Sequence, residues 1–335
     1  MSSLTPGDIE VKRTIFLGSI CISLFSFRSA AFAADGWAGT NGDTTGGAGG
    51  TVVTVDNVKD LEHYAELGTT PYIVRISGTI DIGAGVVEIR SNKTLIGADP
   101  NATLVGTLGF RNRDSNIIVE RLSITNPNGD GIALKQDITN VVITKCTIYD
   151  CGDGCLDITN RSDLVTVSWC KFHYTNPSNN HRFACLCGSS DKQSEDKGKI
   201  RITFHHNWWS SNCHERLPRV RYGRVHCYNN YYDCPGNNYC IGVGVESHIR
   251  VENNYFNNVN KAWANYYEGK AYPPGEIGWN TGNVFKNTAV PTWAKNNYAT
   301  IFKPPYSYKM DHAKDVPALV KTYAGAKAPY PPAKK

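Results

Sequence analysis

The sequence predicts an all-β fold, a right-handed parallel β-helix in which successive coils stack into one solenoid. The main observation is a repeat near 24 residues. Six strand-like segments end in a bulky residue at positions 124, 148, 172, 209, 232 and 256, at intervals of 24, 24, 37, 23 and 24. Periods in the twenties are typical of leucine-rich repeats and of β-helices. The segments are rich in Val, Ile, Thr, Phe and Tyr and lack a leucine framework, which favours the β-helix.

A solenoid needs covered ends, and the segments outside the repeats are suited to cover them. Residues Asn57–Leu67 have the apolar spacing of a short amphipathic helix that would cap the first coil. The Pro- and Lys-rich segment Pro304–Lys335 is expected to wrap the outside as a C-terminal tail, with one helix at Val316–Tyr323. The longest interval of the repeat contains the polar stretch Thr175–Lys199, which we interpret as an inserted loop.

Asparagine is unusually frequent, with 30 residues or 9% of the chain, and the repeat gives some of them a role. Asn207, Asn230 and Asn254 each stand two residues before the end of a repeat. Stacked on successive coils, their amides both donate and accept, so we expect a ladder of side-chain hydrogen bonds along the solenoid. Cys146 and Cys170 occupy the same position two coils earlier, where the coil spacing suits either a disulfide or a stacked pair of free thiols.

Composition bounds the class of protein. The chain has 335 residues, of which 41% are hydrophobic and 19% charged, and a formal net charge of +5. These values exclude wholesale disorder, and the Gly and Pro residues lack the three-residue period of collagen. The small positive excess fits an acidic partner but is too diffuse to predict nucleic-acid binding.

The N-terminus predicts export. Lys12 and Arg13 precede the apolar run 14–27, and Ala31-Phe32-Ala33 follows as a small-residue cleavage site. This order is typical of a secretory signal peptide, so we assign residues 1–33 to it and residues 34–335 to a single domain. No later segment is apolar enough for a membrane helix. The mature protein is therefore expected to be secreted and extracellular.

Ten cysteines remain after the signal peptide, all between Cys146 and Cys240. In an oxidising compartment such a cluster predicts disulfides, with one or two buried free thiols, although the counts do not give the pairing. Zinc binding is the weaker alternative, because Cys151-x3-Cys155 and Cys185-x-Cys187 are not standard zinc spacings.

Three aspartates form the first candidate site. Asp130 and Asp153 are 23 residues apart, one coil of the repeat, and Asp157 follows four residues later across a bend that contains glycine. Carboxylates brought together repel one another unless a cation joins them, and a site of oxygen ligands alone favours Ca²⁺ over zinc. The alternative is that these Asp-Gly pairs only form turns.

The second candidate site is a run of arginines, Arg216, Arg219, Arg221 and Arg224. Strand alternation puts Arg219 and Arg221 on one side, and guanidinium groups suit carboxylates, so an acidic ligand is the natural partner. The alternative is a solvated basic face. A histidine cluster lacks a metalloprotease pattern and is assigned structural or surface roles: His205, His206, His214 and His226.

Several motifs occur in a fixed order along the mature chain. They are Thr44-Thr-Gly-Gly-Ala-Gly-Gly50, Asn92-Lys-Thr-Leu-Ile-Gly97, Asp153-Gly-x-x-Asp157, Gly188-Ser-Ser-Asp191, Arg216-x-Pro-x-x-Arg221, Val225-His-x-Tyr-Asn-Asn-Tyr231, Pro304-Pro-Tyr-Ser-Tyr308 and Asp315-Val-Pro-Ala-Leu-Val320. In this order they resemble the secreted pectate lyases of polysaccharide lyase family 1, which are parallel β-helices.

The resemblance implies a calcium-dependent lyase. It implies that catalytic Ca²⁺ is held by three aspartates, Asp130, Asp153 and Asp157. Arg216 takes the position of the Brønsted base, and Arg221 that of a substrate-binding arginine, with Arg219 beside it. The implied reaction is β-elimination on α-1,4-polygalacturonate, which leaves 4,5-unsaturated oligogalacturonates. We expect a monomer whose partner is this acidic polysaccharide, without nucleic acid or membrane.

The chain departs from the family near its Gly-Ser-Ser-Asp motif. The family often has a substrate-contacting lysine where this chain has His181-Arg182-Phe183, so Arg182 is the candidate replacement. Two alternatives follow. One is a pectin lyase that acts on methyl-esterified polymer without Ca²⁺, and the other is a non-catalytic β-helix that binds acidic polysaccharide.

Overall fold

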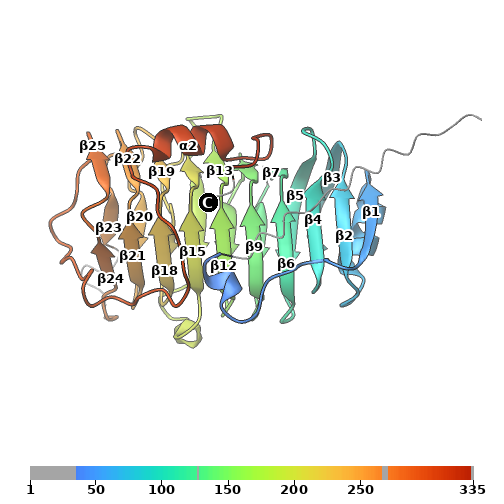
Figure 1. Ribbon diagram of the computed structural model, residues 1–335, viewed down its shortest axis with the longest axis horizontal. Coiled ribbons are helices and arrows are strands. Elements are labelled where there is room, and N and C mark those ends of the chain that lie inside the picture. Colours follow the sequence, from blue (N-terminus) through green and yellow to red (C-terminus); the bar gives the residue numbers. More distant parts are fainter. Residues whose placement is uncertain (1–34, 127, 266–270, 333–335) are drawn as a thin grey trace, which may run out of the picture. The chain divides into compact units, whose positions relative to one another are not determined.

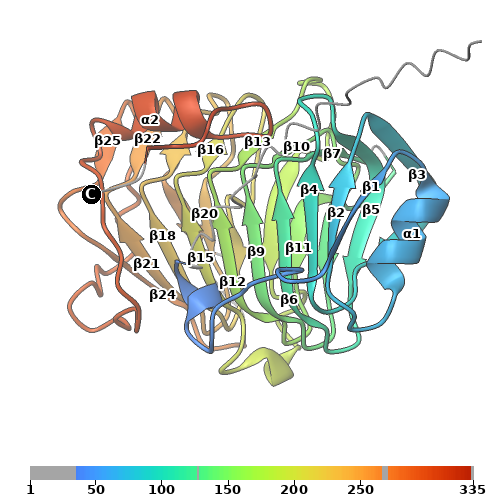
Figure 2. The ribbon, with the colours of Figure 1, turned by 45° about the vertical axis from the view of Figure 1, so that its right-hand side comes forward.

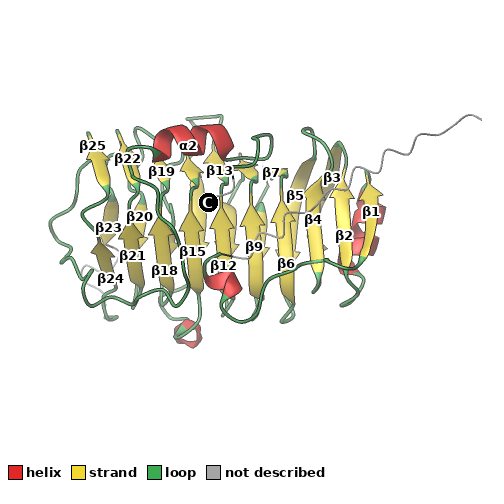
Figure 3. Ribbon diagram, in the orientation of Figure 1, coloured by secondary structure: helices red, strands yellow, loops and turns green. Residues whose placement is uncertain are grey.

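The computed structural model describes residues 35–126, 128–265 and 271–332, and these residues form the predicted parallel β-helix (Figure 1). The signal peptide assigned to residues 1–33 lies outside the described residues. Strands dominate and helices are few (Figure 3). Neither described α-helix is long and apolar enough to cross a bilayer.

One face of the solenoid is a ten-stranded parallel sheet. Each strand comes from a different coil, in chain order from one end to the other (Figure 1). Its strands are β1 (Thr51–Val55), β2 (Tyr72–Ile76), β4 (Lys93–Gly97), β6 (Ser115–Glu120), β9 (Thr139–Thr144), β12 (Asp163–Ser168), β15 (Arg201–His205), β18 (Arg224–Tyr228), β21 (His248–Glu252) and β24 (Glu276–Trp279).

The other faces are two parallel stacks that the long strand β5 (Thr103–Phe110) joins into a fifteen-stranded sheet, with β3 (Thr79–Glu88) paired to β5. The first stack continues through β8 (Ile132–Leu134), β11 (Gly154–Ile158), β14 (Phe183–Cys187), β17 (Arg219–Val220), β20 (Ile241–Val243) and β23 (Trp263–Asn265). The second continues through β7 (Ser123–Thr125), β10 (Thr147–Tyr149), β13 (Lys171–His173), β16 (Trp208–Trp209), β19 (Tyr231–Tyr232), β22 (Tyr255–Asn257) and β25 (Val284–Lys286).

The register of the second stack confirms the sequence repeat. The six bulky residues that end the repeats pair directly from coil to coil; they are Ile124, Ile148, Phe172, Trp209, Tyr232 and Phe256. Phe285 continues the column. All six are buried. The aromatic rings stack, with centroids 4.4 Å apart for Phe172 and Trp209 and 4.4 Å for Tyr232 and Phe256. The repeat therefore marks the interior column that every coil contributes.

The predicted asparagine ladder is present at the corner between the ten-stranded sheet and the second stack. Each Nδ2 donates to the Oδ1 of the next coil, at 3.0 Å from Asn207 to Asn230 and 3.0 Å from Asn230 to Asn254. Asn283 extends the ladder at 3.2 Å. The residues before Asn207, Asn230 and Asn254 have a positive φ, as at Asn229, and such residues turn the chain at this corner.

The predicted disulfides are wrong. All ten cysteines from Cys146 to Cys240 are free and buried. Cys146 and Cys170 precede paired strands of neighbouring coils and lie side by side without a bond between their sulfur atoms. Burial, together with a hydrogen bond between the two side chains, raises the pKa of the Cys146 thiol. The thiols therefore pack as core residues.

The N-terminal capping helix is confirmed as α1 (Val58–Glu66) at the β1 end of the solenoid (Figure 2). The Asn57 side chain caps it by accepting a hydrogen bond from the Asp60 backbone N–H at 3.0 Å. Leu61 and Ala65 face inward and are fully buried in the core. The helix thus covers apolar surface that the first coil would otherwise expose.

The C-terminal tail wraps the outside as predicted. Helix α2 (Val316–Tyr323) has the predicted bounds and packs Val316 and Val320 against Tyr231 of β19. Farther along, Gly325 N–H donates to Trp169 O, and the buried Lys145 Nζ donates to Pro329 O at 2.8 Å. A short 3-10 helix, Trp37–Gly39, lies against β12 and β15 at the other end of the chain, through bonds to Thr166 and Thr203.

The interpretation of Thr175–Lys199 as an inserted loop is partly wrong. The segment contains the strand β14, which pairs with β11 and β17, and a 3-10 turn at Ser194–Asp196. Ala184, Cys185 and Cys187 of β14 are fully buried. The flanking polar residues form the loops, and the short apolar run between them completes the coil.

Candidate active site

The three predicted aspartates lie in or just before two neighbouring strands of the first stack, β8 and β11. Asp130 precedes β8, Asp153 precedes β11, and Asp157 lies within β11. Asp130 Oδ1 accepts from Gly154 N–H at 3.1 Å, and Asp157 Oδ1 accepts from Leu186 N–H at 3.3 Å. A Cβ at Gly154 would lie 2.5 Å from Asp157 Oδ1 and 3.3 Å from Asp130 Oδ1. The Asp130 and Asp157 carboxylates therefore converge above this glycine, and any side chain there would fill the space between them.

Burial and repulsion among the aspartates raise the pKa values of this carboxylate pair despite the nearby cations. Burial raises the pKa of Asp157 to about 7, and Asp130 adds to the rise while Arg216 opposes it. Burial also raises the pKa of Asp130, with repulsion from Asp153 as the second cause. Such a pair tends either to take up a proton or to bind a cation near neutral pH. A divalent metal ion bound there would cancel the repulsion between the two carboxylates.

The donor set suits Ca²⁺ in two of its three members. Asp130 and Asp157 present oxygen atoms toward one space, and hard cations of this size take carboxylate oxygens. Asp153 is turned outward, with 61% of its side chain exposed and Oδ1 at 3.0 Å from His181 Nε2. Within the described ranges no three Asp, Glu, His or Cys side chains converge on one point. Asp153 would complete the set by exchanging His181 for the ion.

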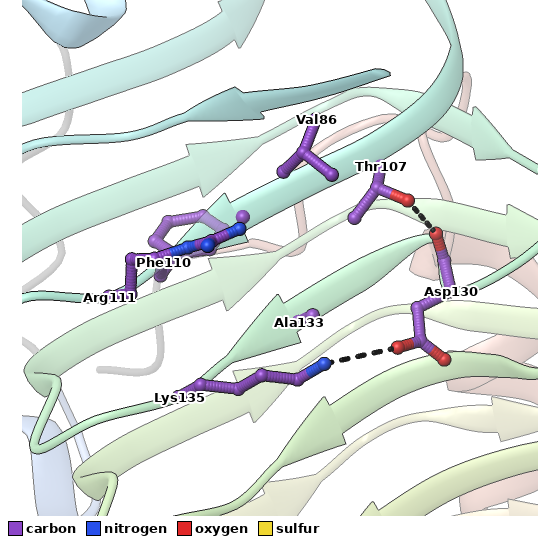
Figure 4. Close-up of a pocket in the computed structure, with 8 residues that line it drawn as sticks. Val86, Thr107, Phe110, Arg111, Asp130, Ala133 and Lys135 are labelled. Atoms are coloured by element: carbon purple, nitrogen blue, oxygen red, sulfur yellow. Dashed lines mark hydrogen bonds and ion pairs between the residues drawn. The ribbon is translucent and has the colours of Figure 1, made fainter. Parts of the chain in front are cut away.

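A small pocket of about 150 Å³ adjoins Asp130 (Figure 4). Lys135 and Arg111 line it, and Lys135 Nζ lies 3.8 Å from Asp130 Oδ2. The backbone carbonyl of Asp130 accepts from Thr107 Oγ1 at 2.8 Å, which fixes the turn. Sequence reasoning missed both cations. Lys135 stands five residues after Asp130, and its relevance follows only from the strand β8 that brings it back beside the carboxylate.

Arg216 lies beside the carboxylates on the coil that follows β14. Its φ is +63°, and its carbonyl accepts from Cys185 N–H at 2.7 Å, which anchors the residue to β14. The guanidinium lies 4.3 Å from the centre of the Phe183 ring. Its Nε is buried and has no hydrogen-bond partner in the part of the chain that the structure describes. Arg216 is thus held by its backbone and by one aromatic face, while a polar atom stays available.

Arg219 and Arg221 have different surroundings. Arg219 lies in the same column of the first stack as Asp157, two coils along, with Leu186 between them. Arg221 is buried, and its Nε donates to Asp191 at 2.6 Å while Nη1 donates to Gly188 O at 2.8 Å. Arg221 therefore ties the Gly188–Asp191 turn to the coil of Arg216.

Arg182 is not among the residues that converge on the carboxylates. Its Nε donates to Asn179 O at 2.8 Å and Nη1 to Asn212 O at 3.2 Å, so the guanidinium is bound to loop backbone. The neighbouring side chains reach the site instead. His181 contacts Asp153, and Phe183 lies under Arg216. The departure at His181-Arg182-Phe183 was the available signal for these two residues.

Three of the four histidines lie on or next to strands of the ten-stranded sheet, whereas His214 stands two residues before Arg216, with its backbone N–H donating to Arg182 O at 2.9 Å. His205 and His206 share a contact between their Nδ1 atoms at 2.8 Å and contact Asp35 and Asp311 through Nε2. His226 Nε2 lies 2.7 Å from Glu252. His214 Nδ1 lies 3.7 Å from Glu215. The structural role predicted for the histidines fits these contacts, which join the ten-stranded sheet to both terminal segments.

Comparison with known proteins identifies the family of this chain. A sequence model of a pectate lyase domain matches residues 14–328. A pectate trisaccharide-lyase of Bacillus licheniformis is 32% identical over 323 residues, covering 88% of this chain and 87% of that protein. A β-solenoid that carries such matches is a polysaccharide lyase. The chain belongs to the pectate lyase family.

Solved structures show the same fold. A Bacillus subtilis pectate lyase variant superposes with a TM-score of 0.75 at 24% identity, covering 88% of this chain and 96% of that one. A pectate lyase from Bacillus sp. N165, solved in complex with trigalacturonate, superposes with a TM-score of 0.71 at 28% identity, covering 87% and 98%.

Proposed function

We propose that this protein is a secreted, Ca²⁺-dependent pectate lyase that cleaves α-1,4-polygalacturonate by β-elimination and releases 4,5-unsaturated oligogalacturonates. The observation that carries the proposal is that the Asp130 and Asp157 carboxylates converge above Gly154, with Lys135 and Arg216 as the neighbouring cations. The relative solved with trigalacturonate supports an oligogalacturonate ligand. The mature protein is proposed to be a monomer of residues 34–335.

Asp130, Asp153 and Asp157 would hold the Ca²⁺ ion. When bound, the ion supplies a Lewis acid that neutralises the substrate carboxylate and makes the adjacent C5 proton easier to remove. Asp130 and Asp157 would be the fixed ligands, because one oxygen of each is held by a backbone N–H donor. Asp153 can adjust its position, since its carboxylate is exposed and its partner among the described residues is His181.

Arg216 is proposed as the base. Its unprotonated guanidine takes the C5 proton of the galacturonate residue, the C4–O4 bond breaks as the C4=C5 double bond forms, and the departing O4 receives a proton from water. An arginine has an ordinary pKa of about 12.5–13.8, so this role predicts an alkaline optimum. The Phe183 ring lies against the guanidinium and would hold it over the substrate.

The remaining arginines are proposed to bind the acidic polymer. Arg219 is partly exposed in the Asp157 column and is placed to contact a substrate carboxylate. Arg221 orients the coil through Asp191 and offers its remaining donors. Arg182, which we proposed as the replacement for the family lysine, would act by holding the loop of His181 rather than by reaching the ion site.

The test is an assay of purified protein on polygalacturonate, which follows the ultraviolet absorbance of the unsaturated product. Activity with added Ca²⁺ that a chelator abolishes supports the proposal. Chelator-insensitive activity on highly esterified pectin would establish a pectin lyase instead, and no product on either polymer would leave a polysaccharide-binding β-helix. Export is tested separately, since the N-terminal residue of protein recovered from culture medium should be Ala34.

A further inference from the structure

A second pocket lies on the other stack of the solenoid, away from the aspartates. Its volume is about 400 Å³, within the range of about 300–1,000 Å³ of small-ligand pockets. One wall is the outer face of β10, β13 and β16, and the other is the segment from α2 to Ala328. The tail is fixed over it by Ala326 N–H, which donates to Thr147 Oγ1 at 3.0 Å, and by Arg121 Nη1, which donates to Ala328 O at 3.3 Å.

The lining is basic. Lys171, Lys321 and Lys327 all contribute, and no acidic residue lines the pocket among the described residues. Lys171 and Lys327 have no carboxylate partner there, and the nearest partner of Lys321 is Asp233 Oδ2 at 3.9 Å. Three lysines that line one pocket, with a single distant carboxylate between them, favour an anionic ligand.

The lining is also aromatic. Tyr149 and His173 stack with ring centroids 5.1 Å apart and planes within 8°. Trp208 follows on the next coil, with Lys171 Nζ 4.6 Å from its ring centre. Burial, together with the neighbouring Lys171, lowers the pKa of His173 to about 4, so this ring is neutral at working pH. Flat, half-buried rings beside cations suit a ligand that has apolar faces as well as negative charge.

Three residues that line the pocket form a row along the solenoid axis. Thr147, Lys171 and Trp208 pair in register on consecutive coils, about 4.8 Å apart. A hydroxyl, an ammonium and an indole are thus set in line, and a linear ligand can contact each in turn. Pyranose rings carry C–H faces, and each uronate residue adds one carboxylate, so an oligouronate presents both features in a repeating line.

We propose that this pocket is a second binding site for oligogalacturonate, separate from the cleavage site and independent of Ca²⁺. The choice of galacturonate among acidic sugars rests on the proposed function. Lysine ammonium groups would bind the sugar carboxylates directly, and the rings of Tyr149, His173 and Trp208 would pack on the sugar faces. The site would hold a second polymer segment while the first lies at the aspartates.

The experiment is calorimetric titration of the full chain carrying Arg216→Ala, in chelator, with trigalacturonate as the probe. We expect saturable binding, weakened at least tenfold by Lys171→Gln combined with Lys327→Gln and unchanged by Lys59→Gln on α1. If the double variant unfolds too readily to be measured, Lys327→Gln alone replaces it. Lys327 is exposed, so this variant should fold, and it should still weaken binding. Tyr149→Ala should weaken binding similarly.

Neutral and inorganic probes separate the alternatives. Maltotriose should not bind, and inorganic phosphate should bind at least tenfold more weakly than trigalacturonate. Equal binding of phosphate, no saturable binding of trigalacturonate, or binding that the lysine variants leave unchanged would overturn the second site. Lyase activity is measured separately on the chain with Arg216 intact. Activity without chelator-resistant binding refutes only this inference, and binding without activity refutes only the proposed function.

Discussion

Two buried carboxylates on different faces of the solenoid show opposite behaviour. Asp157 on the first stack and Glu252 on the ten-stranded sheet have 9% and 1% of their surface exposed. Burial alone would raise both pKa values. Yet the pKa of Asp157 rises to about 7, whereas hydrogen bonds from His226, Tyr298 and Tyr308 outweigh burial and lower that of Glu252 to about 2.

The difference lies in the number of donors. Glu252 accepts from His226 at 2.7 Å and Tyr308 at 2.8 Å, and pairs with Arg250 at 3.0 Å. Asp157 accepts one backbone N–H and faces Asp130. A carboxylate whose acceptor sites are filled holds the fold together, and one whose sites are left open can bind a cation. We call Glu252 and its partners the structural cluster, and Asp130 and Asp157, which are proposed to bind Ca²⁺, the functional cluster. The number of partners, rather than burial, distinguishes the two.

The largest expected effect removes the proposed base. Arg216→Ala should lower kcat on polygalacturonate by about 10³-fold, which is within the range for loss of a general base. Initial rates at saturating Ca²⁺ measure it. Arg224→Ala, at an exposed position of the same run, is the matched control and should leave kcat within twofold. Equal rates for the Arg216 variant and the unmodified chain would remove Arg216 from the reaction.

The next effect breaks the structural cluster. Glu252→Gln should lower the free energy of unfolding by about 3–5 kcal/mol, because it leaves Arg250 and its neighbours without their buried anion. Urea unfolding followed by circular dichroism measures the loss, with Glu62→Gln on α1 as a surface control. Activity per folded molecule should be unchanged. A loss below about 1 kcal/mol would mean that this cluster does not stabilise the fold.

A smaller effect appears as a pH dependence. The folded-state pKa of Glu252 is about 2 against an ordinary value of 4.5, so its contribution to stability is complete above pH 4.5 and is lost as pH falls toward 2. The unmodified chain should therefore lose stability over that window more steeply than Glu252→Gln. Urea midpoints at pH 7, 4.5 and 3 give the comparison, and parallel curves would contradict the assignment.

The smallest effect adjusts the functional cluster. Lys135→Gln should lower the Ca²⁺ concentration for half-maximal activity by two- to threefold, since Lys135 Nζ then no longer competes for Asp130. The effect is small because the lysine is half exposed and exposed ion pairs contribute about 0.2–1 kcal/mol. Lys59→Gln should leave the calcium requirement unchanged. A higher requirement in Lys135→Gln would show that the lysine supports the ion.

The sequence predicts the features of this molecule that recur with the coil. The repeat identifies the interior column from Ile124 to Phe256, and asparagine spacing identifies the ladder. Helix α2 has the expected bounds because its pattern is local. Such features depend on periodicity, which is visible along the chain.

The sequence does not predict features that depend on the direction of single side chains. Strand β14 lies within a polar stretch, and its burial follows from pairing with β11. Asp153 turns to His181, and Lys135 returns to Asp130, through turns whose geometry the residue types leave open. The disulfide prediction was wrong because all ten cysteines are buried as free thiols that pack in the core.

The ten buried thiols have a consequence for how the protein fails. Shielded in the core, they do not exchange while the coils are intact, so the chain needs no oxidant or disulfide isomerase to fold. Once the coils open in an oxidising medium, the same thiols ionise and pair at random, and the chain cannot return. Heat inactivation should therefore be irreversible in air and reversible with a reductant, which makes the lifetime of the folded enzyme a matter of rate rather than of equilibrium.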